Sequence, residues 1–352
     1  MKINDEDISR LAAAVSDEGE DFFCAVGAVP TYAEINGVFH CRRARTLLLI
    51  PGAFTLPDEI TGEDLSARFF REGRCGGSVY ALPDQTVAAD VRLLGDAAFR
   101  AYCADVKTER VLVPFAELAD TSEYGRRSAY GWIGEFRAEL PYELSVTALF
   151  SEPLPDYGPF LSRFGSPGCT VVDASVSPSV YAYETADVRK KYACTLSLAE
   201  KRAGRRTAVF FTDRREAEEF RRFLLRQGKQ SLYLNGGMTA AEQKAALDAF
   251  DMGEALLIAT KSAIPYALFY RADEAIFCGA PYSTSLMARC ASFSEEGELA
   301  CCFCPDDFKT DINIIRHFAE NLPEEEREEY LEKRLQKLLE VKSVLCATED
   351  MI

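Results

Sequence analysis

Hydroxyl-bearing and cationic side chains follow two apolar runs of this sequence, where they could bind phosphate groups. Short apolar runs with polar ends, such as 207–211 and 255–259, are typical of buried parallel strands. Open α/β sheets bind their ligands outside the carboxyl ends of such strands. We therefore predict contacts to a phosphate backbone at this edge. The residues concerned are Thr212, Arg214, Arg215, Thr260 and Lys261.

Three cysteines, Cys301, Cys302 and Cys304, include the C-x-x-C spacing of zinc and redox motifs. They lie in an apolar run, where alternate side chains point to opposite faces of a sheet. No second cysteine pair lies at ligand distance in the sequence. This pattern favours buried thiols, so we predict no metal site. The two histidines, His40 and His317, are interpreted as surface or packing residues.

A phosphate-binding loop of the ATPase type is not recognisable in the sequence. Such a loop needs glycines whose N–H groups surround the phosphates, then a Lys, then a Ser or Thr that binds magnesium. The closest pattern, Gly228-Lys229, is followed by glutamine and has Phe223 where the leading glycine belongs. The sequence therefore gives no direct sign of nucleotide binding.

Strands that alternate with helices must position these side chains. Amphipathic stretches at 214–226 and 239–250 are predicted as helices, and Thr239 with Glu242 forms a capping box at the start of the second. Strands at this spacing indicate a parallel sheet covered on both faces. The predicted strands of this half are 207–212, 231–234, 255–259, 274–278 and 299–304.

The first half of the chain shows the same kind of alternation less clearly, and 352 residues leave room for two domains. We predict helices at 5–15, 64–70 and 87–104. The predicted strands are 21–26, 45–51, 109–115, 145–148, 169–173 and 180–183.

The order of elements from 207 to 304 resembles the second motor lobe of RecQ-type DNA helicases. Here the strand ends in Thr-Asp-Arg-Arg, the next segment reads Leu-Tyr-Leu-Asn-Gly-Gly-Met, and a later strand reads Leu-Leu-Ile-Ala-Thr. The family has Asn-Ser-Arg, Tyr-His-Ala-Gly and Val-Ala-Thr at these places. The resemblance implies an α/β fold of two RecA-like parallel-sheet lobes, of the P-loop NTPase and helicase type, plus a C-terminal helix. We expect lobe 1 at 1–187, lobe 2 at 188–322 and a charged helix at 323–352.

The residues that match the family's nucleotide site have lost its chemistry. Tyr32 and Ala33 stand where the family has the phosphate-loop Lys and Ser/Thr. In the acidic motif, whose two acids hold magnesium in active members, this chain has Pro114 and Phe115, and Glu117 stands where the family has His. The two arginines that reach the nucleotide from lobe 2 become Ser292 and Glu295. The resemblance therefore predicts a degenerate site with no catalytic residues and no cofactor.

The charge distribution leaves two interpretations open. The formal net charge is −16, which is unusual for a protein that binds polyanions. The block 189–229 nevertheless contains thirteen Lys or Arg and five Asp or Glu. It could face a phosphate backbone. It could equally be a solvated helix with ion pairs at i,i+4 spacing.

The stretch 324–345 reads as a long charged helix with a stripe of leucines. The stripe could pack back on lobe 2, or it could be a surface for a protein partner or self-association. RecQ-type proteins continue here into a helix pair that binds zinc through four cysteines. This chain has Cys346 near the first ligand position, so the resemblance implies truncation before that module.

We therefore predict a catalytically inactive RecQ-like helicase homologue that acts as a nucleic-acid-binding or protein-binding subunit, with weak binding of single-stranded DNA. One alternative is a divergent ATP-dependent DNA helicase of repair or recombination, which would need ATP and Mg²⁺. Another is a purely structural protein–protein module. We expect a cytoplasmic protein without membrane contact, because the N-terminus is acidic, no run of eighteen apolar residues occurs, and twelve cysteines suggest a reducing compartment.

Overall fold

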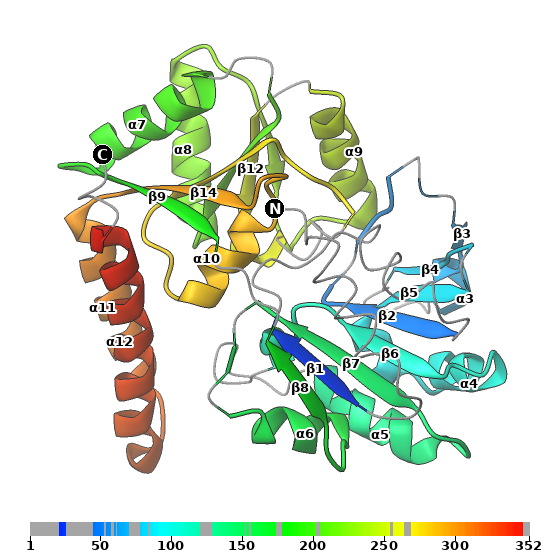
Figure 1. Ribbon diagram of the computed structural model, residues 1–352. Coiled ribbons are helices and arrows are strands. Elements are labelled where there is room, and N and C mark those ends of the chain that lie inside the picture. The colour runs from blue at the N-terminus through cyan, green and yellow to red at the C-terminus, as the bar shows by residue number, and fades with distance from the viewer. Residues whose placement is uncertain are drawn as a thin grey trace. The chain divides into compact units, whose positions relative to one another are not determined.

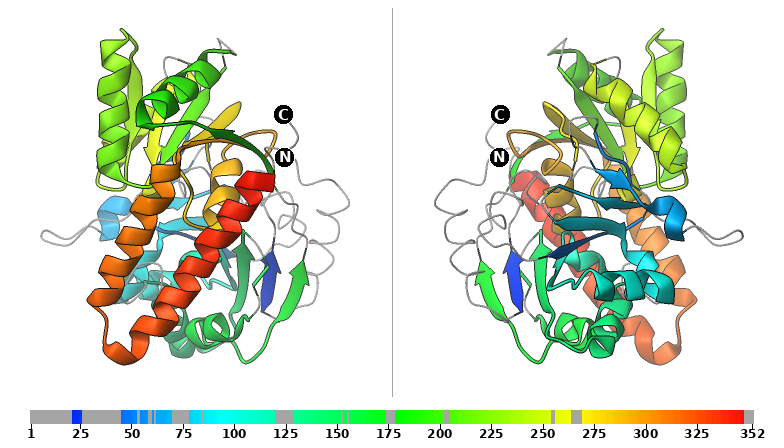
Figure 2. Two further views of the ribbon diagram at one scale, coloured as in Figure 1. Left: turned by 90° about the vertical axis from the view of Figure 1, so that its left-hand side faces the viewer. Right: turned by 90° about the vertical axis from the view of Figure 1, so that its right-hand side faces the viewer.

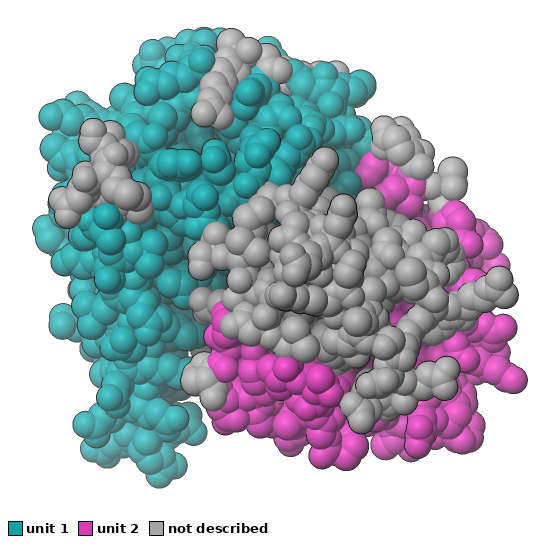
Figure 3. Space-filling view, viewed as in Figure 1, with its two compact units in different colours: residues 1–2, 177–237, 245–352 teal, residues 3–176, 238–244 magenta. Residues whose placement is uncertain are grey.

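A computed structural model shows two β-sheets, each in a compact unit of its own. Unit 1 comprises residues 1–2, 177–237 and 245–352, and unit 2 comprises 3–176 and 238–244 (Figure 3). The structure describes residues 21–25, 45–52, 54–57, 60, 62–69, 78–83, 85–119, 129–151, 153–154, 156–173, 178–201, 205–253, 256–263 and 269–347.

The sheet of unit 2 has the strand order β3-β4-β5-β2-β6-β7-β1-β8 (Figure 1). Its pairs from β5 to β8 are parallel, while β3–β4 and β4–β5 are antiparallel. The apolar run of β2 is buried at every position, which fits a central parallel strand. The strands are β1 Phe22–Ala25, β2 Thr46–Ile50, β3 Glu63–Asp64, β4 Val79–Ala81, β5 Thr86–Asp90, β6 Arg110–Val113, β7 Ser145–Phe150 and β8 Thr170–Asp173.

Helices supply the rest of the core of unit 2. Phe23 of β1 packs against Phe150 of β7 and Phe164 of α6, with ring centroids 5.7 and 5.8 Å away. The described helices are α3 Ser66–Phe69, η1 Val91–Gly95, α4 Ala97–Asp105, η2 Ala116–Ala119, η3 Ala129–Gly131, α5 Trp132–Glu139 and α6 Gly158–Phe164.

The predicted single helix at 87–104 is wrong. The segment forms β5, then η1, then α4. Alanine-rich sequence suits a helix, but β5 is buried at every position between β2 and β4, and this tertiary burial decides its conformation. Asp90 then opens η1 by accepting a hydrogen bond from the Arg92 amide. The predicted helix at 64–70 is reduced to α3, and the predicted helix at 5–15 lies outside the described residues.

The sheet of unit 1 is parallel throughout, in the order β11-β12-β10-β13-β14-β9. The five strands predicted for this half are confirmed within two residues at their ends. The strands are β9 Ser179–Glu184, β10 Thr207–Phe211, β11 Ser231–Leu234, β12 Leu256–Thr260, β13 Glu274–Cys278 and β14 Glu298–Phe303.

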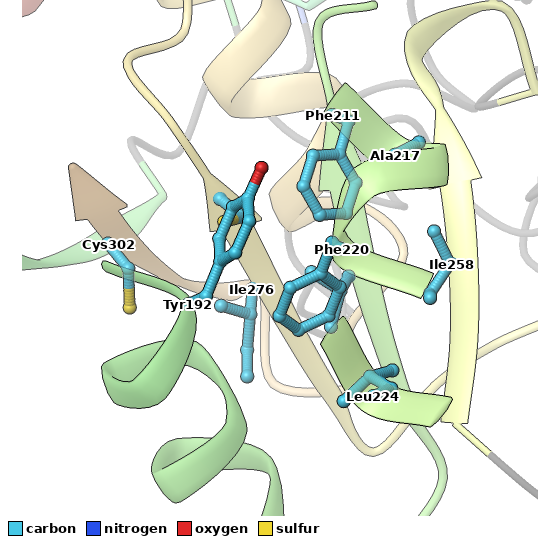
Figure 4. Close-up of a cluster of buried hydrophobic side chains, with 10 residues drawn as sticks. Tyr192, Phe211, Ala217, Phe220, Leu224, Ile258, Ile276 and Cys302 are labelled. Carbon is cyan, nitrogen blue, oxygen red and sulfur yellow. The ribbon is translucent and has the colours of Figure 1, made fainter. Parts of the chain in front are cut away.

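Helices cover both faces of this sheet. On one face, Tyr192 of α7 and Phe220 of α8 pack on Phe211 and Ile276 in a buried cluster (Figure 4). On the other face, Phe293 after α10 contacts Phe210 of β10. The predicted capping box is present, because the Thr239 amide donates to Glu242 and the Glu242 amide donates to Thr239. The helices are α7 Val188–Lys201, α8 Arg214–Arg226, α9 Ala240–Asp251, α10 Thr284–Ala291, α11 Pro305–Glu320 and α12 Glu324–Ala347.

Strand β9 differs from the sequence expectation. The boundary expected at residue 187 placed the predicted strand 180–183 in the first lobe. In the structure β9 pairs with β14 along its whole length and forms the edge of the sheet of unit 1. Pairing between segments more than a hundred residues apart left no local sign in the sequence.

The C-terminal helices α11 and α12 form an antiparallel hairpin that belongs to unit 1 (Figures 1 and 2). Leu338, Val341 and Leu345 of α12 are buried, so the leucine stripe packs back on this unit. Phe318 and Leu339 remain 58 and 60% exposed. None of the described helices is long and apolar enough to cross a membrane.

Candidate nucleic-acid interface and degenerate nucleotide site

The carboxyl ends of β10 and β12 bring the five predicted phosphate contacts to one edge of the sheet. The two strands are parallel neighbours, and Phe211 of β10 is paired with Thr260 of β12. Thr212 and the first residues of α8 follow β10, and Lys261 follows β12. The predicted residues therefore lie together at the carboxyl ends of neighbouring strands.

A chain of hydrogen bonds joins this edge to the turn after β11. The Thr260 and Ser262 hydroxyl oxygens lie 2.9 Å apart, and the Gly236 amide donates to the Ser262 hydroxyl at 3.1 Å. A Cβ atom on Gly236 would lie 2.9 Å from that hydroxyl oxygen, so the close approach requires glycine. The Asn235-Gly236-Gly237 turn is recognisable in the sequence, but Ser262 is not. Ser262 belongs to the candidate site because of its contacts to Thr260 and Gly236 in the folded chain.

Tyr282, after β13, ties the same edge to the C-terminal hairpin. The Lys261 ammonium nitrogen lies 4.4 Å from the centre of the Tyr282 ring. The Arg334 guanidinium, on α12, lies 5.2 Å from the same ring. Both distances are in the range of cation–π attraction. Lys261 and α12 are thus linked through one aromatic ring.

The arginines at the start of α8 are exposed and ion-paired. Arg214 pairs with Glu218 at 3.2 Å and Arg215 with Glu219 at 3.6 Å, and the two arginine side chains are 66 and 90% exposed. Exposed pairs of this spacing contribute only about 0.3–0.5 kcal/mol. A phosphate group could therefore replace the glutamates at little cost.

Much of the basic block 189–229 is compensated by nearby acids. Lys191 is fully buried, and its ammonium nitrogen lies 2.6 Å from Glu216 and 2.5 Å from Asp307. Lys229 pairs with Glu200 at 2.6 Å. The interpretation of the block as a helix face with ion pairs thus explains several of its charges. The burial of Lys191 has no local signal in the sequence.

The first turns of α7, α8 and α11 converge on the Lys191 ammonium. Its pKa is raised: burial acts to lower it, but the surrounding Cys278 sulfur and the carboxylates of Glu216 and Asp307 outweigh burial. One turn further along α11, burial and then the charges of Asp307 and Glu216 raise the pKa of Asp311 to about 7. This carboxyl group changes its charge near neutral pH.

The acidic-motif positions in unit 2 hold a strained, buried turn. Pro114 and Phe115 follow β6, and both are buried. Phe115 has a φ of 59°, a left-handed conformation that is an outlier for a bulky residue. The Glu117 carboxylate accepts hydrogen bonds from the Ser151 hydroxyl and from the Ser151 amide, the latter at 3.3 Å. Glu117 therefore joins the segments that follow β6 and β7.

The remaining degenerate positions fall in different places. Tyr32 and Ala33 lie outside the described residues. The Ser292 hydroxyl donates to the Ala288 carbonyl at the end of α10. Glu295 pairs with Arg206 at 3.0 Å, and Arg206 directly precedes β10, so Glu295 lies at the amino edge of the strands. The structure does not bring Glu295 together with Thr212 and Thr260.

The cysteines of β14 are buried, and Cys301 and Cys302 alternate along the strand. Within the described ranges, no group of three or more His, Cys, Asp or Glu side chains could hold a metal ion. His317 is exposed near Glu320, and His40 lies outside these ranges.

Part of unit 1 matches a known protein family. Residues 190–264 match the family model described as the helicase conserved C-terminal domain. No curated protein matches the chain.

The fold is similar to that of the DUF1998 helicase MrfA bound to DNA and AMPPNP. The TM-score is 0.55 at 13% identity over 86% of this chain, which spans about half (50%) of the MrfA chain. It is also similar to S. cerevisiae Dbp5 bound to RNA and ADP BeF3, with a TM-score of 0.53 at 12% identity. This match covers 94% of this chain and 85% of the Dbp5 chain. The two mostly parallel sheets have the fold of the RecA-like lobes of these helicases, and C-terminal helices follow the second lobe.

Proposed function

We propose that this chain is a nucleic-acid-binding subunit built on a RecQ-like helicase motor that no longer hydrolyses ATP. The observation that carries the proposal is the hydrogen bonding of the buried Glu117 carboxylate. Glu117 is the acidic residue left in the acidic motif, it is 6% exposed, and its carboxylate is occupied by the hydroxyl and amide of Ser151. Hydrolysis needs acids that hold magnesium and orient water, and a carboxylate held in this way serves structure instead.

The other degenerate positions support the same conclusion. Pro114 and Phe115 have no group that binds magnesium. Ser292 and Glu295, proposed to stand at the arginine positions, are neutral and anionic, so neither could stabilise the negative charge that develops on a transferred phosphoryl group. Glu295 already has a cationic partner in Arg206.

Nucleic-acid binding is supported by the carboxyl edge of the sheet of unit 1. The Thr212 hydroxyl, two exposed arginines and Lys261 lie together there, and such groups contact phosphates in protein–nucleic acid complexes. Thr260 is 4% exposed and its hydroxyl is engaged by Ser262, so it supports this edge from beneath. Because these contacts are to the backbone, binding should be tolerant of sequence and should weaken steeply with salt.

The hydrolysis claim is tested by ATP turnover of the purified chain with and without single-stranded DNA. We expect no turnover above the buffer blank in either condition. DNA-stimulated turnover that is lost in Glu117→Gln would show an active, divergent helicase and overturn the claim. A nuclease-free preparation and an active helicase run in parallel serve as controls.

The binding claim is tested by fluorescence anisotropy with a labelled oligothymidylate at several salt concentrations. Replacement of Arg214, Arg215 and Lys261 by Glu should abolish binding. A matched control replaces Arg222, Arg226 and Lys229 by Glu. It makes the same change in net charge near the opposite end of α8, and we expect it to retain most binding. Equal loss in both variants would indicate a general charge effect and reject the proposed edge.

A protein-binding role is the second candidate, because two large apolar side chains of the C-terminal hairpin face solvent. Phe318 and Leu339 are 58 and 60% exposed. A cell-extract pull-down with wild type and Phe318→Glu, each with and without nuclease, separates the roles. A partner that survives nuclease and is lost in Phe318→Glu supports this candidate, whereas loss with nuclease alone supports nucleic acid.

A further inference from the structure

Two cysteine sulfurs from different elements of unit 1 approach each other closely. The Cys194 Sγ of α7 lies 3.7 Å from the Cys302 Sγ of β14. Cys302 is fully buried, whereas Cys194 is only half-buried, so Cys194 is the member of the pair nearer to solvent. Neither residue contributes to the proposed nucleic-acid edge.

The fold holds this pair in place. Strand alternation points Cys302 toward the face on which α7 packs, where it belongs to the buried cluster that contains Tyr192 (Figure 4). One turn before Cys194, the buried ammonium of Lys191 anchors α7 to Glu216 and Asp307. The two sulfurs therefore face each other across a packed helix–strand contact and not across a mobile loop.

The separation suits bond formation. A disulfide requires an S–S distance of about 2.05 Å. Rotation of both side chains about their Cα–Cβ bonds would bring the two sulfurs closer together. Cys194 also has the character of an attacking thiol: the hydrogen bond from Cys302 lowers its pKa to about 7 against the opposing effect of burial, and Lys201 adds to the lowering. Thiolates, not thiols, react with peroxides.

We propose that Cys194 and Cys302 are a dithiol site that reduces hydroperoxides by forming a reversible disulfide. The Cys194 thiolate attacks the peroxide, the O–O bond breaks, and Cys194 becomes a sulfenic acid while hydroxide leaves and takes up a proton. The Cys302 sulfur then attacks the sulfenic sulfur, and its proton leaves with the departing oxygen as water. Two thiols lose two electrons, and hydrogen peroxide becomes two molecules of water.

Cys278 is the competing partner. It lies next to Cys302 in the parallel register of β13 and β14, on the same face of the sheet. Cys278 is fully buried, and burial raises the pKa of its thiol. It is therefore protonated and inaccessible to peroxide, which leaves Cys194 as the point of attack.

The test treats the full chain with hydrogen peroxide, blocks the remaining thiols with iodoacetamide, and locates cross-linked peptides by fragmentation mass spectrometry. We expect a Cys194–Cys302 link, a loss of two titratable thiols, and full recovery with dithiothreitol. Cys278→Ser and Cys301→Ser should form the link as wild type does. Cys194→Ser should form none, and its circular dichroism should match wild type because the replacement is half-buried.

Three outcomes would overturn the proposal. Cys194 could be driven to sulfinic acid without any link, the link could join Cys278 to Cys302, or the loss of thiols could come from exposed Cys346 through links between chains. The variant Cys346→Ser separates the last outcome, because it should still lose two thiols if the internal pair reacts.

Discussion

Asp311→Asn should make the protein more stable at neutral and alkaline pH. The wild-type carboxyl group has its pKa raised from 3.8 to about 7. It faces the carboxylates of Asp307 and Glu216, with the ammonium groups of Lys191 and Lys261 as opposing charges. Because the folded state holds the proton more tightly than the unfolded state, this group's contribution to stability is greatest below pH 3.8 and declines as pH rises to about 7.

The magnitude follows from the size of the shift. One pKa unit corresponds to about 1.4 kcal/mol, so a shift of roughly three units sets an upper limit of about 4 kcal/mol. The side chain is partly exposed, and solvent relieves part of this cost, so we expect a gain of about 1–3 kcal/mol for the variant at pH 8. Below pH 4 the two proteins should differ little, because both side chains are then neutral.

Urea unfolding below pH 4 and at pH 8, followed by circular dichroism, measures this effect. Trp132 is the single tryptophan and lies in unit 2, so its fluorescence follows the other unit separately. Asp306→Asn is the matched control, because Asp306 lies on the same helix with a side chain that is 67% exposed. If Asp311→Asn is less stable than wild type at pH 8, the carboxylate acts as a needed counter-ion to the lysines and the reasoning is refuted.

Two further predictions concern single positions with clear geometry. Lys107 has a φ of 55° just after α4, a backbone conformation that favours glycine. Lys107→Gly should therefore stabilise unit 2 by about 0.5–1 kcal/mol. Urea unfolding followed by Trp132 fluorescence measures this change, and a loss of stability would contradict the prediction. Leu338 is 4% exposed and its neighbour Leu339 is 60% exposed. Leu338→Ala should therefore cost about 2–5 kcal/mol by thermal or urea unfolding, and equal effects of Leu338→Ala and Leu339→Ala would show that α12 is not docked as described.

Local sequence signals were sufficient for most of unit 1. Strands such as β10 and β13 are short apolar runs between polar ends, and α8 begins at Asp213, whose side chain accepts from the Glu216 amide. In these segments the apolar period, the cap and the turn residues all indicate the same structure. The family comparison at 190–264 falls in the same region.

What the sequence could not predict depends on contacts between distant segments. Lys191 reads as one more member of a basic block, yet it is buried because Glu216 and Asp307 come from two other helices. Ser262 becomes part of the candidate site only because Gly236 approaches it across the sheet. The bond between Glu117 and Ser151 joins segments 34 residues apart, and no spacing rule identifies it.

The position of β9 has a consequence for dissecting the protein. A fragment limited to residues 190–264 would keep β10, β11 and β12 but lose β9, β13 and β14. The flank of β10 that normally pairs with β13 would then be bare, with Phe210 and Phe211 beside unpaired N–H and C=O groups. Exposed apolar strand edges of this kind pair with strands of other chains, so such a fragment should aggregate. The smallest fragment that contains all six strands of this sheet begins before Ser179 and includes β14.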